Sequence, residues 1–540
     1  MKKKFILLFC TIFATVIYSR NTTATITPDV KKRPNIIFIM ADQLAASFVG
    51  CYGSGVNSTP NIDRLAKSGV RFEHCYTHAP ACAPNRAAIF TGRSMEANGM
   101  VQNNLHLRPE HNPLFTQLLQ TNGYRTGGFG KFHFTEMPLY PYDDMSPYGF
   151  DEVVMTEDPK FGHWLNWVKE TAPEYYEQAL SLCWPQPYST KDAKLTAEWQ
   201  KAYNKHLKPR QDASEWSKMF TSPLPAELQQ SVFIMDKSLE FIRKQQKKVA
   251  DNPYFCFISF VAPHDPYDPP EPYDTMFDPK DMKPPVPMVG DYYTNTIMEN
   301  HRHVFGFDKI SKDVKAIKKL RAYYHGNLKL IDDQIGRLVD YLEQTGQMEN
   351  TIIMFTTDHG DMLGDHGLIT KWAMHYENSI HCPLIVNGAG IKKGIVSKRL
   401  TSSMDVFSTI CDMAKIDLRP PVESRSFAST CFDGKNDPGW PVMTIQLGPI
   451  RSIMTRDGWR FTKYAQQGEG QMYDLRNDPD EQNNLYHQDK WQKKKMELYE
   501  QMTVAYMGAY STFYYHNLPQ VNGRPCLIDN TYRELTPLPW

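Results

Sequence analysis

One short segment has residue types and a spacing that suit nucleophilic catalysis. It reads Cys82-Ala83-Pro84-Asn85-Arg86 and is followed by Thr91-Gly92-Arg93. The C-x-P-x-R spacing alone is suggestive, and the Thr-Gly-Arg segment after it makes a chance match much rarer. Cys82 is therefore a candidate nucleophile, with a plain thiolate and a structural cysteine as the simpler alternatives.

Polar side chains follow four predicted strands at the points where these strands end. The carboxyl ends of parallel strands meet at one edge of a sheet, and ligand sites form beyond that edge. Because acidic, cationic and imidazole groups recur at all four ends, we expect one shared site there. The strands and the residues after them are Asn35–Met40 with Asp42 and Gln43, Tyr124–Gly128 with Lys131 and His133, Tyr254–Val261 with His264, and Thr351–Thr357 with Asp358 and His359.

These strands alternate with helical segments along most of the chain. Apolar residues from Leu320 to Leu342 keep the three-four spacing of a helix laid on a sheet. The pattern predicts an α/β fold with a large doubly wound, mostly parallel sheet flanked by helices. Further predicted elements are helices at Asn61–Ser68, Glu227–Lys247 and Asp313–Gln344 and strands at Val70–Tyr76 and Pro383–Asn387.

The chain divides into a catalytic region at residues 33–435 and a smaller α+β subdomain at 436–540. The second region combines three short strands with one helix, at Val442–Gln446, Arg451–Arg456, Trp459–Tyr464 and Trp491–Tyr510. Within the first region, residues 157–225 form an insertion with no clear strand that holds five of the ten tryptophans. It is either a lid or substrate-binding region, or a segment that its tryptophans pack onto the domain.

The N-terminus has the features of an exported protein. Three lysines precede an apolar run from Phe5 to Tyr18, which predicts a signal peptide at residues 1–24 and a secreted or periplasmic product; a buried first helix is the alternative. No other stretch is apolar and long enough to span a membrane. The sixty basic and sixty acidic residues cancel, so no global field favours nucleic acid or an anionic membrane. The remaining cysteines lack the paired spacing of a zinc site.

From Asn35 to Leu485 the chain resembles the formylglycine-dependent, type I sulfatase family of the alkaline-phosphatase-like superfamily. The resemblance rests on the segment around Cys82 and on a late motif from Tyr473 to Leu485. It implies that a maturating enzyme oxidises Cys82 to formylglycine. A hydrated aldehyde has two hydroxyls: one attacks sulfur and displaces the alcohol, and the other collapses to expel sulfate.

The resemblance also implies a metal site that includes Cys82 and four other residues, Asp42, Gln43, Asp358 and His359. Hard oxygen ligands suit calcium. Gln43 departs from the commoner second aspartate and His359 adds a nitrogen, which leaves manganese open alongside calcium. Each carboxylate taken alone would be read as an N-cap or turn residue.

Cationic groups complete the implied site. Lys131 and His133 lie two residues apart, on the same side of an extended segment, and in the family such a pair binds the sulfate. His264 and Lys371 match groups beside the leaving oxygen, where charge builds as the bond breaks. Arg86 is expected to stabilise the formylglycine and to contact the metal site.

Three further histidines are assigned less firmly. His366 is read as part of a loop turn, and His375, which follows Trp372, as a residue that could face substrate. His381 stands where the family often has arginine, so the ion pair usual there is expected to be missing.

The resulting prediction is a sulfatase acting on a sulfated carbohydrate rather than on a small aryl or choline sulfate. A phosphonate monoester or phosphodiester hydrolase shares the fold, the formylglycine and a Gln/His-containing metal site, but Lys131 and His133 argue against it. A catalytically inactive protein that binds sulfated glycans would have lost nucleophile or metal residues, and none is missing here.

Overall fold

The computed structural model describes residues 33–137, 144–184, 193–247, 252–288, 302–303, 306–371, 374–417, 419–465, 469–517, 520–521, 524–528 and 535–537. The predicted signal peptide at residues 1–24 lies outside them, as does Trp372. Within the described residues, no helix combines the length and apolar character needed to cross a bilayer.

An eight-stranded sheet forms the centre of the molecule, with the order β4-β3-β5-β1-β6-β7-β2-β8. Strand β7 runs antiparallel to both of its neighbours, and all other neighbouring pairs are parallel. The predicted α/β fold with a mostly parallel sheet is therefore confirmed. The strands are β1 Asn35–Ala41, β2 Val70–Tyr76, β3 Arg125–Gly130, β4 Glu152–Met155, β5 Tyr254–Phe260, β6 Thr351–Thr357, β7 Leu384–Gly388 and β8 Ile395–Ser402.

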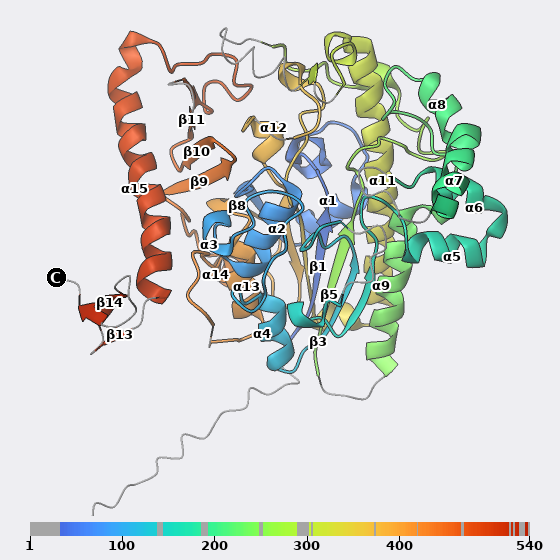
Figure 1. Ribbon diagram of the computed structural model, residues 1–540. Helices are drawn as coiled ribbons and strands as arrows, with labels where there is room; N and C mark the ends of the chain where they lie inside the picture. The colour runs from blue at the N-terminus through green and yellow to red at the C-terminus, as the bar shows by residue number, and fades with distance from the viewer. Residues whose placement is uncertain are drawn as a thin grey trace, which may run out of the picture.

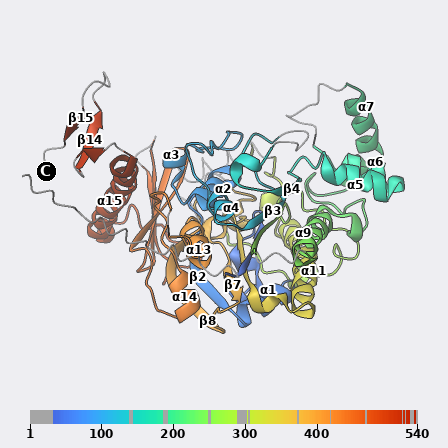
Figure 2. The same cartoon turned by 90° about the horizontal axis from the view of Figure 1, so that it is seen from below.

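Helices cover both faces of this sheet (Figures 1 and 2). After Asn35, strand β1 is apolar because alternate side chains enter different cores. Ile37 and Ile39 face one core, and Ile36, Phe38 and Met40 face the other. The first core packs against α1 Pro60–Lys67, α9 Gln230–Lys247 and α11 Val314–Gln344, and the second against α2 Cys82–Thr91, α4 Phe115–Thr121, α13 Asp405–Met413 and α14 Ala428–Asp433.

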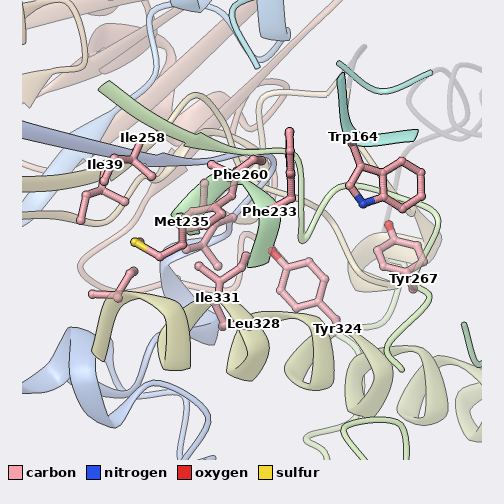
Figure 3. Close-up of a cluster of buried hydrophobic side chains, with 14 of the residues drawn as sticks. Ile39, Trp164, Phe233, Met235, Ile258, Phe260, Tyr267, Tyr324, Leu328 and Ile331 are labelled. Carbon is pink, nitrogen blue, oxygen red and sulfur yellow. The ribbon is translucent and has the colours of Figure 1, made fainter. Parts of the chain in front are cut away.

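The first core also shows how α11 is held on the sheet (Figure 3). Leu328 and Ile331 of α11 lie in the same buried cluster as Ile258 and Phe260 of β5. Burying four such side chains contributes several kcal/mol, at roughly 25 cal/mol per Å² of apolar surface. The long helix is thereby fixed against the strands whose ends carry the polar residues.

The described part of the insertion at residues 157–225 contains four α-helices, together with loops, and its tryptophans mostly pack. Trp164 is 1% exposed and donates its indole N–H to the carbonyl of Leu228, 2.9 Å away. Trp216 is buried in the same core. Packing, rather than a lid, accounts for these two rings. The helices are α5 His163–Thr171, α6 Tyr176–Ser181, α7 Ala193–Ala202 and α8 Lys208–Asp212.

A second, antiparallel sheet of four strands follows, in the order β12-β11-β10-β9. Helix α15 lies beside it (Figure 1), with Leu498 and Met502 buried against Phe461. The expected α+β character is confirmed, although β12, like β4 and β8 of the main sheet, was not predicted. Its elements are β9 Val442–Leu447, β10 Ile450–Thr455, β11 Trp459–Tyr464, β12 Gly470–Asp474 and α15 Gln492–Asn517, with short strands β13 Gln520–Val521, β14 Arg524–Ile528 and β15 Leu535–Pro537 after them. Two further short helices among the described residues are α3 Met95–Asn98 and α12 Glu377–Ile380.

Candidate active site

The expected convergence of strand ends takes place because β3, β5, β1 and β6 are consecutive in the sheet. Asp42 directly follows β1, Lys131 follows β3 and Asp358 follows β6. Neighbouring strands lie only about 5 Å apart, so side chains leaving their carboxyl ends can meet. His264 reaches the same place from the loop after β5.

Helix α2 brings the candidate nucleophile to this edge. Cys82 is its first residue and Arg86 lies one turn later, so both side chains project from the same face. Arg86 is completely buried and donates to both strand-end carboxylates, at 2.8 Å to Asp358 Oδ2 and 3.2 Å to Asp42 Oδ2. It also donates to the carbonyl of Lys131 and the hydroxyl of Ser259. Arg86 thus contacts the two aspartates for which the sequence predicts a metal-binding role.

Four buried residues bring potential metal ligands together. One ligand atom from each of Asp42, Cys82, Asp358 and His359 lies within 4.8 Å of the others. His359 Nδ1 is 3.0 Å from the carbonyl of Gly360, which can only accept, so Nδ1 carries the hydrogen. The lone pair is then on Nε2, which faces Cys82 Sγ at 3.2 Å. Two carboxylates and an oriented imidazole fit a divalent cation.

Gln43 joins the cluster through its amide oxygen, which accepts from Lys371 Nζ at 2.8 Å. Its amide nitrogen donates to Asp361 Oδ2 at 2.6 Å, and Tyr267 donates to the same oxygen. The other Asp361 oxygen accepts from the backbone of Leu363 and Thr370, in the loop that leads to Lys371. Asp361 therefore sets the orientation of the Gln43 amide and shapes this loop.

Positive charges surround the sulfur of Cys82. Lys371 Nζ lies 3.1 Å from Sγ. Burial by itself would raise the pKa of the Cys82 thiol, but Lys131 and Lys371 outweigh burial and hold that pKa well below its ordinary value. An oxygen placed here would be stabilised as an anion by the same charges.

Lys371 and His264 form a proton-sharing pair, with Nζ and Nε2 2.7 Å apart. His264 Nδ1 faces the carbonyl of Asp265 and so carries a hydrogen, which leaves Nε2 to face Lys371. Two protonated groups cannot donate to each other at this distance, so one of the two supplies a lone pair. Such a pair can hold a proton for a leaving oxygen.

Lys131 and His133 both enter the site, but not on an extended segment as predicted. Strand β3 ends at Gly130, and His133 has a left-handed φ of 53°. The turn forms because Glu157 Oε1 accepts the backbone N–H groups of Phe132 and His133, at 2.8 and 3.0 Å. Both ring nitrogens of His133 are buried and find no hydrogen-bond partner within the described residues, as expected of a group that awaits a ligand.

Sequence reasoning missed Glu157, Asp158 and Asp361. Asp158 pairs with the Lys131 ammonium at 2.6 and 2.7 Å. Glu157 and Asp158 follow β4 just as Asp42 follows β1, but the four residues of β4 gave no strand signal. Asp361 lies three residues after Asp358, where its position at the strand end could have singled it out.

The three less firmly assigned histidines lie in packing positions. His366 stacks on Tyr376 with ring centroids 3.9 Å apart, in a turn as expected. His375 Nδ1 hydrogen-bonds Ser452 of β10 at 2.7 Å. His381 Nδ1 lies 3.1 Å from Glu377, so a polar pair is present where a missing ion pair was expected.

Comparisons with known proteins agree with this site. A family profile described as Sulfatase matches residues 34–416, and one described as N-sulphoglucosamine sulphohydrolase, C-terminal, matches residues 364–507. An arylsulfatase of Clostridium perfringens is 29% identical over 474 residues, covering 86% of this chain and 92% of that protein. An N-acetylglucosamine-6-O-sulfatase of Bacteroides thetaiotaomicron is 25% identical over 537 residues, covering 86% of this chain and 85% of that protein.

The fold is also found in solved structures. The phosphonate monoester hydrolase from Silicibacter pomeroyi superposes with a TM-score of 0.71 at 22% identity, covering 88% of this chain and 96% of that one. The Sulfatase profile spans well over half of the 540 residues and includes Cys82, both strand-end aspartates and Lys371. The chain therefore belongs to the sulfatase family, the type I sulfatases of the alkaline-phosphatase-like superfamily, and is a sulfuric ester hydrolase.

Proposed function

We propose that the protein hydrolyses a sulfate ester on a sulfated carbohydrate, using a formylglycine derived from Cys82 and a divalent cation. One observation carries the proposal: Cys82 Sγ lies at the centre of a buried cluster, 3.1 Å from Lys371 Nζ and 3.2 Å from His359 Nε2. A structural cysteine needs neither neighbour. The family in general uses a metal and formylglycine.

The cation is calcium in this proposal. Asp42 and Asp358 offer carboxylate oxygens, Gln43 an amide oxygen and His359 a lone pair on Nε2. Three of these four donors are oxygens, which calcium prefers. When bound, the cation lowers the pKa of the attacking hydroxyl and polarises the sulfate group. The single nitrogen donor makes manganese the competitor to exclude.

The side chains around Cys82 divide the remaining work. Arg86 holds Asp42 and Asp358 in position through its guanidinium. Lys131 and His133 face the sulfate oxygens, with His133 placed to take a proton during elimination. Lys371 Nζ lies 3.1 Å from the sulfur and 2.7 Å from His264 Nε2, and this pair delivers a proton to the leaving oxygen.

A carbohydrate substrate is supported by the Bacteroides relative, which is named for 6-O-sulfated N-acetylglucosamine. The match of residues 364–507 to a profile named for N-sulphoglucosamine sulphohydrolase agrees with that class. We further propose that residues 1–24 are a signal peptide, that the product is exported, and that a maturating enzyme acts on Cys82 first. Residues 33–435 are proposed as the catalytic domain, with an insertion at 157–225, and 436–540 as the C-terminal subdomain.

The test is release of inorganic sulfate from a panel of sulfated mono- and oligosaccharides by protein produced with a maturating enzyme. Mass spectrometry of the peptide around Cys82 shows whether the cysteine is converted, and Cys82→Ala serves as the blank. Release above the blank would establish the reaction and name the sugar. If converted protein instead cleaves phosphonate monoesters and no sulfate ester, the activity of the Silicibacter structural neighbour is the better assignment. Turnover of neither class would leave a glycan-binding protein.

A further inference from the structure

Lys131, the ammonium group next to Asp42 and Cys82, is tightly held by carboxylates. Its Nζ lies 2.6 and 2.7 Å from the two oxygens of Asp158 and 2.7 Å from Asp42 Oδ2. The Lys131 side chain is fully buried and that of Asp158 is 5% exposed. A lysine whose sole task was to attract an anion would gain from fewer such partners.

The position of Asp158 follows from the end of β4. Strand β4 pairs in parallel with β3, so the residues after β4 lie beside the turn that carries Lys131 and His133. Two consecutive carboxylates use this position differently. Glu157 accepts the backbone N–H groups of Phe132 and His133, whereas Asp158 binds the side chain of Lys131. The shape of the turn is already fixed by Glu157, so Asp158 is not needed to form it.

The contribution of Asp158 is therefore mainly its charge. Arg86 and Lys131 belong to one buried ion-pair network with Asp42, Asp158 and Asp358, and Lys371 Nζ lies 3.1 Å from Cys82 Sγ beside it. Without Asp158 the protein would present one more positive charge to an incoming anion. The carboxylate lies about 5 Å from an anion bound to Lys131, two hydrogen-bond lengths in series. In buried surroundings the electrostatic repulsion between two unit charges at this distance is strong.

We propose that Asp158 is a specificity-determining residue that makes the site favour monoanions over dianions. The inference rests on the proposed function, in which the substrate is a sulfate monoester with a single negative charge. A phosphate monoester of the same alcohol carries two charges near neutral pH, and the second is repelled by Asp158. Inorganic sulfate, the product, is also a dianion, so the same repulsion speeds product release. Asp158 thus favours binding of the sulfate ester over the phosphate ester, and it speeds the release of inorganic sulfate.

The binding test compares two probes of similar shape and different charge, methanesulfonate and inorganic sulfate. Calorimetry gives the affinity of the purified protein for each, in the wild type and in Asp158→Asn. We expect the preference for sulfate over methanesulfonate to rise at least tenfold in the variant. Asp268→Asn is the matched control, because Asp268 is also buried and pairs with a lysine, Lys160, at 3.4 Å without contacting Lys131. Its preference should stay that of the wild type.

The kinetic test uses 4-nitrophenyl sulfate and 4-nitrophenyl phosphate. Asp158→Asn should raise the ratio of phosphatase to sulfatase kcat/KM at least tenfold and strengthen inhibition by inorganic sulfate. Asp158→Ser removes the charge without placing an amide beside Lys131, and it repeats the test should the asparagine variant not fold.

A purely orienting role makes a different prediction. Loss of Asp158 would then weaken the binding of both probes equally. The ratio of the two affinities and the ratio of phosphatase to sulfatase kcat/KM would both stay unchanged, which would overturn the inference. The binding ratio also separates this inference from the proposed function. A wild type that releases no sulfate from any ester would refute the function, while the calorimetric ratio would still decide whether Asp158 selects by charge.

Discussion

Arg86 and Arg460 are both fully shielded from solvent, and their surroundings differ in kind. Arg86 donates to two carboxylates, Asp42 and Asp358, which also face Cys82 and His359. Arg460 pairs with one carboxylate, Glu481, and its guanidinium lies over the rings of Tyr376 and Tyr473, at 5.2 and 4.7 Å from their centroids. Arg86 lies beside side chains whose potential metal-ligand atoms converge, whereas Arg460 is enclosed by aromatic rings.

Buried charges at a site and buried charges in a structural ion pair differ in what surrounds them. A buried ion pair is weak evidence of function, because structural pairs also tolerate burial when they are well bonded. The Arg460 cluster contains no nucleophile, and its single carboxylate is used up by the arginine and the Glu377 amide. In the Arg86 cluster, the Nε2 lone pair of His359 faces Cys82 Sγ, and both ring nitrogens of His133 are buried without a hydrogen-bond partner among the described residues. Arg460 Nη2 is also buried without a partner among the described residues, so neither burial nor unfilled bonding capacity alone marks the site. The convergence of a thiol, two carboxylates and an imidazole does.

The two clusters are nevertheless connected along the chain. Lys371 belongs to the first, and Tyr376, a few residues later, belongs to the second. His375, between them, bonds Ser452 of the C-terminal sheet. The Arg460 cluster therefore anchors the segment after Lys371 to the second sheet. The comparison predicts that damage to the first cluster removes chemistry and that damage to the second removes stability.

The largest expected effect is that of Cys82→Ala. Turnover should fall at least about 1,000-fold, because no other group replaces the nucleophile, while the thermal midpoint changes little. Sulfate release and a melting curve measure the two quantities. Cys411→Ala, at another buried cysteine, is the control and should keep its activity. More than a trace of turnover in Cys82→Ala would refute the nucleophile assignment.

Asp358→Ala should come next. The change removes a metal-site oxygen and leaves Arg86 without one of its two carboxylates, so calcium affinity should fall at least about 100-fold and the rate with it. Calorimetric titration of calcium into metal-free protein measures the first effect. Asp332→Ala, a buried carboxylate that caps α1 instead, should bind calcium as the wild type does. Normal calcium binding by Asp358→Ala would make the metal assignment wrong.

Arg460→Met should have the opposite profile. It leaves Glu481 buried without its partner, which costs roughly 3–5 kcal/mol of unfolding free energy. Urea unfolding measures this loss, and Arg460→Met combined with Glu481→Gln should recover part of it because no lone charge remains. Calcium affinity should stay within a few-fold of the wild type. A loss of calcium affinity as large as that of Asp358→Ala would end the distinction between the two clusters.

A smaller effect is expected from pH. Burial, together with the charge of Arg460, lowers the pKa of both His366 and His375 to about 3. The unfolded chain takes up these protons near pH 6.5 and the folded chain does not, so stability is full above about pH 6.5 and falls as the pH drops. At pH 5 the loss is about 2 kcal/mol for each histidine. Urea unfolding at pH 7 and pH 5 should show a smaller difference for His375→Gln than for the wild type, and equal differences would count against a neutral buried His375.

Much of the fold and part of the site could be predicted from sequence, because the patterns that indicate them lie within single short segments. Strand β6 has an apolar centre flanked by threonines, and its predicted bounds, Thr351–Thr357, are those observed. A polar residue that soon follows a buried strand lies at the sheet edge, which placed Asp42, Lys131 and Asp358. The Cys82 segment was found from its C-x-P-x-R spacing together with the Thr-Gly-Arg segment that follows it.

The remainder depends on contacts between distant segments. Strand β4 has four residues, three of them only half-buried, so neither it nor the carboxylates after it stood out. The left-handed turn at His133 forms because Glu157, 24 residues later, accepts its backbone N–H. The role of Asp361 depends on Gln43, 318 residues away in the chain. The residue pattern within a single segment cannot predict hydrogen bonds between residues so far apart in the chain.

The smallest expected change in calcium affinity concerns the hydrogen bond between Gln43 and Asp361. Asp361 can only accept while ionised, so it turns the Gln43 amide nitrogen toward itself and the amide oxygen toward the cluster. Asp361→Asn places two amide groups face to face, and Gln43→Glu places two carboxylates together; each single change should weaken calcium binding about tenfold. In the double variant the new amide at position 361 donates to the new carboxylate at position 43, and Tyr267 can accept the other N–H of that amide. Calcium affinity should return to the wild-type value or above it, since the carboxylate at position 43 adds a negative charge. If the two losses simply add, Asp361 acts on the loop to Lys371 alone, and the orientation of Gln43 is set by something other than this hydrogen bond.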